Sequence, residues 1–164
     1  MRFEFLFFGR PKAAYLAAGI DDFAGRLGHY AEVSVKILKE QKGNDREAER
    51  VLAREGEELL RHCAKASFVV ALDVGGRECS SEELAATLTR WEHQGINQVI
   101  FIIGGPLGLA PAVRARADLL LSLSRLTFTH DLARLLLMEQ LYRAYTIKAG
   151  TGYHKYHAGH LIKS

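Results

Sequence analysis

The sequence predicts an α/β protein in which helices cover both faces of a parallel sheet. Apolar runs of strand length recur along the chain, and stretches with helical patterns separate them, which is the alternation expected of parallel strands joined by helices. At 164 residues the chain is long enough to bury a core as a single domain, residues 1–164, without disulfides or a structural metal. The apolar runs are Phe3 to Phe8, Val33 to Leu38, Phe68 to Leu72, Val99 to Ile103 and Leu119 to Leu123.

The first apolar run is predicted to be a strand and not an export signal. Arg2 and Glu4 bring charge into it, and its uninterrupted apolar stretch is too short for a secretory signal. No other run approaches membrane-spanning length, so we expect no membrane partner. Cys63 and Cys79 lack a Cys-x-x-Cys spacing and are predicted to be free thiols. The expected location is therefore a reducing, cytoplasmic one.

A helix is predicted near Asn44 to Ala64. Its apolar side chains fall on one face, which is typical of a helix packed on a sheet. The residues of this face are Val51, Leu52, Leu59, Leu60 and Cys63. We expect Glu55, Glu57 and Glu58 to lie largely outside that face.

The next helix is predicted to begin at Ser80-Ser81-Glu82-Glu83, which has the arrangement of a capping box. Its apolar positions are Leu84, Leu88 and Trp91. At this spacing Trp91 fits a core position better than a platform for base stacking.

The last predicted helix, roughly Asp131 to Lys148, is apolar around most of its circumference. A helix of this kind must be buried on most sides, and one sheet cannot cover it all, so a second copy of the chain is the expected partner. The alternative is a fully internal helix. The apolar residues are Leu132, Leu135, Leu136, Leu137, Met138, Leu141, Tyr142, Tyr145 and Ile147.

Positive charge is concentrated toward the C-terminus. Residues 110–164 hold eight Lys and Arg against three Asp and Glu, a net of +5, whereas the first 109 residues carry −2. This asymmetry favours a polyanionic partner such as nucleic acid, with Arg134 and Arg143 as candidate RNA or interface contacts. Solvated surface charge is the alternative.

The run Val99 to Ile103 leads directly into Gly104-Gly105-Pro106-Leu107-Gly108-Leu109. Glycines allow unusual backbone angles and let a ligand lie directly on main-chain N–H groups, while Pro106 stiffens the turn. The turn is therefore a candidate binding loop. A plain strand-to-helix corner is the alternative interpretation.

Several segments together resemble the RlmH family of SPOUT methyltransferases. Beside the glycine turn, they are Leu121-Ser122-Leu123-Ser124-Arg125-Leu126-Thr127-Phe128-Thr129-His130, Gly152-Tyr153-His154-Lys155, Leu141-Tyr142-Arg143-Ala144 and Arg54-Glu55-Gly56-Glu57. The resemblance covers nearly the whole chain. It implies methylation of N3 of a pseudouridine in 23S ribosomal RNA, with the assembled ribosome as substrate.

The resemblance further implies a C-terminal trefoil knot, a homodimer paired through it, and S-adenosyl-L-methionine bound in the knotted loops. No metal is implied, because the sulfonium cofactor already carries an activated methyl group. The residues that the resemblance places at the cofactor are Leu72, Gly104, Gly105, Arg125, Leu126, Thr127, Phe128, Thr129 and His130.

The candidate catalytic residues are Tyr153, His154 and Lys155. The nucleophile is a ring nitrogen that must lose its proton, so a base is expected nearby. By intrinsic pKa His154 is the better proton acceptor, while Lys155 could hold a phosphate or the imide oxygen.

The chain departs from the family pattern at four places. Thr129 and Gly152 stand where proline is usual, and Asp131, in place of an uncharged residue, is expected to cap the last helix. The chain also continues beyond Lys155. These departures bear more on the tail than on the cofactor site.

Three rival interpretations remain open from the sequence. His154, His157 and His160 recur every third residue, as in some metal sites, although a terminal segment with a glycine gives little rigidity. Glycine turns also serve α/β nucleotide-binding proteins, but this turn has neither the Gly-x-Gly-x-x-Gly nor the Walker pattern. The third is a ribosome-associated protein that keeps the fold without catalysing.

Overall fold

The computed structural model describes residues 1–65 and 67–153. Its elements follow in the order β1 (Arg2–Phe8), α1 (Ala14–Leu27), β2 (Glu32–Leu38), the 3₁₀ helix η1 (Asp45–Glu47), α2 (Ala48–Arg61), β3 (Phe68–Arg77), α3 (Ser81–His93), β4 (Gln98–Ile102), α4 (Pro111–Arg116), β5 (Leu119–Leu121) and α5 (His130–Ala149).

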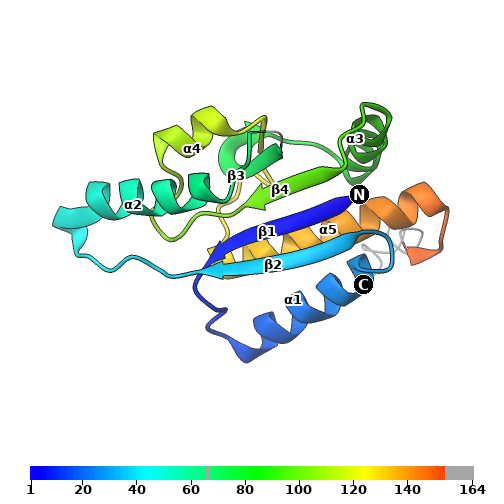
Figure 1. Cartoon of the computed structure of the whole chain (residues 1–164). Coiled ribbons are helices and arrows are strands. Elements are labelled where there is room, and N and C mark those ends of the chain that lie inside the picture. The colour runs from blue at the N-terminus through cyan, green and yellow to red at the C-terminus, as the bar shows by residue number, and fades with distance from the viewer. Residues whose placement is uncertain (66, 154–164) are drawn as a thin grey trace.

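The five strands form one parallel sheet in the order β2-β1-β4-β3-β5. Helices α1, α3 and α5 cover one face, and α2 and α4 cover the other (Figure 1). The predicted α/β class with a parallel, helix-covered sheet is confirmed. The trefoil knot stays a prediction.

The pleat of β1 and β4 divides the core between the two faces. Phe3, Phe5, Phe7 and Phe101 pack on the side of α1, α3 and α5 together with Trp91 of α3. The ring of Trp91 lies 4.9 Å from that of Phe68, and its predicted core position is confirmed. The opposite cluster contains Leu6, Phe8, Ile100 and Ile102 of the sheet, Leu59 of α2 and Val113 of α4. Because both faces are covered, β1 is apolar from Phe5 to Phe8 and β4 is apolar from Val99 to Ile102.

The predicted helix boundaries hold in part. The capping box is present: Ser80 Oγ accepts from the backbone N–H of Glu83, and the Glu83 carboxylate accepts from that of Ser80. The segment predicted as one helix from residue 44 is split, because the Asn44 side chain accepts from Arg46 N–H and starts the 3₁₀ turn before α2. Strand β3 runs past Leu72 to Arg77 through a bulge, whereas β5 ends at Leu121.

One expectation about burial was wrong. Glu55 lies on the buried face of α2, with 4% of its surface exposed. Helix α5 packs against α1, α3 and the sheet within the chain, and none of its large apolar side chains in residues 130–149 is exposed. Several of them are only half-buried, so pairing with a second copy stays a prediction; they are Leu132, Leu135, Leu136, Tyr142 and Ile147.

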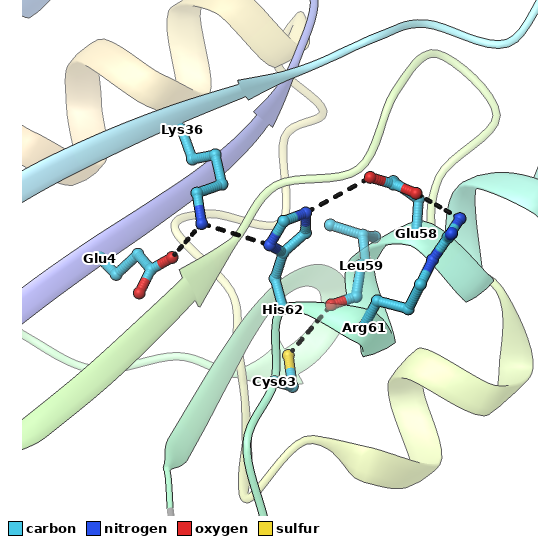
Figure 2. A network of polar contacts seen from close by, with 7 residues as sticks. All are labelled: Glu4, Lys36, Glu58, Leu59, Arg61, His62 and Cys63. Atoms are coloured by element: carbon cyan, nitrogen blue, oxygen red, sulfur yellow. Dashed lines mark hydrogen bonds and ion pairs between the residues drawn. The ribbon is translucent and has the colours of Figure 1, made fainter.

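A network of polar side chains connects the sheet to the C-terminal end of α2 near strand β2, at the edge of the sheet (Figure 2). Lys36 of β2 lies 3.4 Å from the Glu4 carboxylate and 3.3 Å from His62 Nδ1, and His62 Nε2 lies 3.3 Å from Glu58. The Cys63 thiol donates to the backbone carbonyl of Leu59. Burial raises the pKa of this thiol, so it is a poor nucleophile. Both cysteines are free, as predicted.

Candidate functional site

A pocket of about 850 Å³ lies beside the bulge of β3, where β4 and β5 end and α5 begins. Four segments line it: residues 12–16 after β1, residues 72–74 of β3, residues 103–109 after β4, and most of residues 121–131. The carboxyl edge of a parallel sheet is the usual ligand-binding edge, because loops from several strands meet there.

The glycine turn, residues 104–109, forms one wall of this pocket, and its backbone folds back tightly on itself. Gly105 and Gly108 make an antiparallel bridge, and Gly108 N–H donates to the Gly105 carbonyl at 3.0 Å. Only Gly108 of the three glycines has a positive φ, +83°. Gly104 is required for a different reason, because a Cβ there would lie 2.8 Å from the carbonyl carbon of Gly108. The glycines therefore bring the turn close to itself and to its neighbours.

A second wall comes from the bulge in β3. Asp73 lines the pocket, and its carboxylate pairs with Arg114 Nη1 of α4 at 2.7 Å. Gly76 allows the strand to return to β5, because a Cβ there would lie 2.7 Å from the backbone of Leu120. Sequence reasoning missed Asp73, although an acidic residue directly after an apolar strand run is a usable signal in an α/β protein.

The segment between β5 and α5 is shaped by side-chain hydrogen bonds to its own backbone. Ser122 Oγ donates to the Ser124 carbonyl at 2.9 Å, and Leu126 N–H donates to Ser124 Oγ at 3.0 Å. Thr129 caps α5 by accepting from Leu132 N–H. These local hydrogen bonds hold the segment in the conformation in which it lines the pocket.

Eight of the nine residues predicted at the cofactor line this pocket: Leu72, Gly104, Gly105, Leu126, Thr127, Phe128, Thr129 and His130. Arg125 does not line it and is exposed. The structure thus brings together residues from β3, the glycine turn and the segment before α5. Lys12, Ala13, Tyr15 and Leu16 also line the pocket and were missed, because nothing local in the sequence places the β1–α1 loop and the start of α1 beside α5.

Asp131 is a first-turn residue of α5 and not its cap, which corrects the expectation. Its Oδ2 accepts from Lys12 N–H at 3.1 Å, and its Oδ1 lies 3.4 Å from Arg134 Nη1. Arg134 in turn donates to the backbone carbonyls of Phe8 and Gly9. The pair therefore fastens the β1–α1 loop, one wall of the pocket, to α5.

Tyr153 lies away from the pocket in the described chain. Its hydroxyl donates to Glu139 Oε1 at 2.9 Å, and the Arg143 guanidinium stacks 4.9 Å from its ring. Burial, followed by the hydrogen bond to Glu139, raises the pKa of Tyr153 to about 12. His154 and Lys155, the other predicted catalytic residues, lie outside the described residues.

Replacing Glu139 by glutamine should make Tyr153 ionise at lower pH. Burial and the carboxylate both favour the neutral phenol, so removing the negative acceptor lowers the pKa from about 12. Ultraviolet titration of tyrosinate would measure the change, with Tyr153→Phe assigning the signal and Tyr15→Phe serving as an exposed control. Superimposable titrations of the wild type and Glu139→Gln would contradict the Glu139 contact.

Most described basic residues of the C-terminal third have acidic partners. Arg116 lies 3.2 Å from Asp118 and Lys148 lies 2.7 Å from Glu92, and Arg143 pairs with Glu139. Arg134 is buried. The charge asymmetry of the sequence therefore overstates the positive surface, and Arg134 does not fit the role of an RNA contact.

Neither a metal site nor a membrane-spanning helix is found in the described part of the chain. Along residues 1–65 and 67–153, no three His, Cys, Asp or Glu residues gather closely enough to hold a metal ion. Across the same ranges, every helix is too short or too polar to cross a membrane. His154, His157 and His160 fall outside these ranges.

Known proteins resemble the chain over nearly its full length. A family model described as a predicted SPOUT methyltransferase matches residues 1–154. Proteins named ribosomal RNA large subunit methyltransferase H from Desulfotalea psychrophila and Syntrophotalea carbinolica are 51% and 44% identical, over 94% of this chain and 100% and 99% of their own. A solved structure of a probable methylase family protein from Haemophilus influenzae superposes with a TM-score of 0.54 at 10% identity. The match covers 92% of this chain and 69% of that chain, and it supports the fold.

Proposed function

Because this chain belongs to the SPOUT methyltransferase family, we propose that it transfers a methyl group from S-adenosyl-L-methionine to N3 of a pseudouridine in 23S ribosomal RNA. The observation that carries the proposal is the pocket at the carboxyl edge of the sheet, in a chain 51% identical to a protein named as an rRNA large subunit methyltransferase. The assembled ribosome is the proposed substrate.

The pocket fits the cofactor by shape and by chemistry. The backbone of the glycine turn and of residues 121–131 offers main-chain N–H and C=O groups at short range, which suits an adenosine. The carboxylate of Asp73 is held in the lining by Arg114 and can accept hydrogen bonds from ribose hydroxyls. When bound, S-adenosyl-L-methionine supplies the activated methyl group, and the protein aligns it with the nucleophile.

The proton on N3 must leave before or during transfer. Tyr153 is a poor base at neutral pH, because its raised pKa of about 12 keeps the phenol neutral. We therefore retain His154 as the proposed proton acceptor and Lys155 as the group that holds a phosphate or the imide oxygen. Tyr153 then serves to anchor the tail to α5 through Glu139.

The chain is proposed to work as a cytoplasmic homodimer of single-domain subunits spanning residues 1–164. Four exposed apolar side chains, those of Tyr15, Val74, Leu107 and Leu126, surround the pocket. A rim of this kind favours a protein partner. A second copy placed there would exclude water from the cofactor and would explain why Tyr153 does not meet the pocket of its own chain.

Methyl transfer from labelled S-adenosyl-L-methionine to ribosomes lacking the modification tests the proposal. We expect the wild type to label 23S ribosomal RNA and His154→Ala to lose about 10²- to 10⁴-fold in rate while it still binds the cofactor, as removal of a general base does. His29→Ala, the same change at an exposed position outside the pocket, is the matched control and should label normally.

Two outcomes would favour the rival interpretations. Cofactor binding by the wild type without any labelling of ribosomes would favour a non-catalytic ribosome-associated protein. Binding of a nucleotide in place of S-adenosyl-L-methionine would favour an α/β nucleotide-binding protein.

A further inference from the structure

Glu55 occupies a position where the pattern of α2 calls for an apolar side chain. The buried stripe of this helix runs through Val51, Glu55 and Leu59 at intervals of four residues. Only 4% of Glu55 is exposed, although charged residues are rarely buried unless they are paired. The carboxyl group therefore needs a physical explanation that the helix alone does not supply.

The carboxyl group lies directly against the glycine turn. A Cβ built on Gly105 would lie 2.9 Å from Glu55 Oε2 and 3.4 Å from Oε1, so the missing side chain of Gly105 makes room for this group. Gly105 lines the pocket and Glu55 does not. The turn thus has the pocket on one side and the Glu55 carboxyl group on the other.

No described cation neutralises this carboxyl group. Its Oε2 is buried without a hydrogen-bond partner among residues 1–65 and 67–153. The charged group that acts on it is another carboxylate, Glu40, which follows β2. Burial, and then Glu40, raises the pKa of Glu55 above its usual value.

The cations of α4 and most of those of α2 pair with other carboxylates; Arg61 of α2 pairs with Glu58, and Arg54 is exposed. On α4, Arg114 pairs with Asp73, and Arg116 pairs with Asp118. On α2 itself, Arg50 pairs with Glu47 of η1. The polar network of Glu4, Lys36, Glu58 and His62 lies on this side of the sheet near its β2 edge. The hydrophobic cluster on this side contains Leu6, Phe8, Leu38, Ile100, Ile102, Ala110 and Val113.

We propose that Glu55 is a positioning residue for the cofactor-binding turn and that it supports Gly105 as the neutral carboxylic acid. An ionised carboxylate here would be a buried charge facing a second carboxylate, which is unfavourable. Ionisation therefore displaces the carboxyl group from beneath Gly105 and disturbs the pocket wall. The inference rests on the proposed function, namely that this pocket binds S-adenosyl-L-methionine.

The sign of the pH dependence follows from linkage. If the neutral form holds the turn, the cofactor binds that form more tightly, and raising the pH through the pKa of Glu55 weakens binding. When only the neutral form binds, the Kd rises by up to about tenfold per pH unit above that pKa. An ordinary structural glutamate on the surface produces no such dependence.

Calorimetric titration of S-adenosyl-L-methionine into the full-length protein across the neutral pH range tests the inference. Glu55→Gln keeps the shape and removes the ionisation, so it should retain the low-pH affinity of the wild type at every pH. Glu57→Gln, an exposed change on the same helix, should follow the wild-type profile. The amine of the cofactor titrates alike in all three proteins, so the difference between their profiles isolates Glu55.

Folding stability gives a second readout that does not need the cofactor. Between the ordinary and the raised pKa the native state binds more protons than the unfolded state, so wild-type stability falls as pH rises through that window. Glu55→Gln should lack this fall and become the more stable protein at the higher pH.

Identical pH profiles of Kd for the wild type and Glu55→Gln would overturn the inference while leaving the proposed function intact. Weaker binding by Glu55→Gln at every pH would overturn it as well, because the ionised form would then be the supporting one. Failure of the wild type to bind S-adenosyl-L-methionine would overturn both the inference and the proposed function.

Discussion

Replacing Gly104 by valine is expected to weaken binding of S-adenosyl-L-methionine by about a hundredfold and to reduce methyl transfer with it. A Cβ at this position would overlap the Gly108 carbonyl group, and it would also lie 3.1 Å from Leu109 Cδ2. The first obstacle is backbone, which cannot move aside as a flexible side chain can. The turn must therefore open, and the wall that it gives to the pocket is lost.

The expected size of this effect is large. Forcing atoms into a packed site costs up to about 3 kcal/mol, which corresponds to about a hundredfold in Kd. Calorimetric titration of the cofactor would measure it, and circular dichroism would verify that the sheet and helices remain. The Gly105→Val variant should be milder, because its Cβ meets the flexible side chain of Glu55.

Gly25→Val is the matched control for Gly104→Val. A Cβ on Gly25, in α1, has no atom within 4 Å among the described residues. The same chemical change there should leave the Kd unchanged, and valine is also a better helix former than glycine. A Gly104→Val protein that binds the cofactor with wild-type affinity would show that the turn does not form the cofactor site.

The parts of the structure that could be predicted from the sequence are those set by local pattern. The run Val99 to Ile103 is apolar throughout because β4 is buried on both faces, and this signal needs no knowledge of the partner strands. The start of α3 was predictable for a similar reason, since both hydrogen bonds of its capping box lie within Ser80 to Glu83. Leu72 and Gly105 could be assigned to one site by resemblance, and the sheet explains why they meet.

The features that could not be predicted depend on partners distant in sequence. Glu55 looks like its solvated neighbour Glu57, and only the approach of Gly105, fifty residues later, distinguishes the two. The position of Tyr153 depends on its hydrogen bond to Glu139, and nothing in the sequence of α5 indicates that Glu139 accepts this bond. The sequence predicts Arg134 as an RNA or interface contact for the same reason, because its acceptors lie at the end of β1, distant in sequence.

Replacing Arg134 by methionine is expected to destabilise the fold strongly. The side chain has no exposed surface, and its guanidinium lies 4.8 Å from the centre of the Phe7 ring. It donates to the carbonyls of Phe8 and Gly9 and pairs with Asp131. Methionine fills much of the volume but leaves the carbonyls of Phe8 and Gly9 without this donor. It also removes the cation that pairs with the Asp131 carboxylate.

Breaking a buried ion pair from one side typically costs about 3–5 kcal/mol, so the free energy of unfolding of Arg134→Met should fall by about that amount. Denaturant unfolding would measure it. Arg46→Met, on an exposed position of η1, should stay within about 0.5 kcal/mol of the wild type. An equal fall in the free energy of unfolding of both variants would show that the buried contacts of Arg134 do not stabilise the fold more than those of an exposed arginine.

A second substitution separates the charge of Arg134 from its hydrogen bonds. Removing Asp131 as well, in Asp131→Asn with Arg134→Met, relieves the unpaired carboxylate and should recover part of the lost stability. Cofactor affinity should fall in Arg134→Met and should not recover in the double variant, because in both proteins the carbonyls of Phe8 and Gly9 lack their donor and the β1–α1 loop is no longer fastened to α5. The double variant should therefore recover stability without recovering cofactor affinity. Asp131 and Arg134 have two roles: they stabilise the fold, and they hold the β1–α1 loop that forms one wall of the pocket.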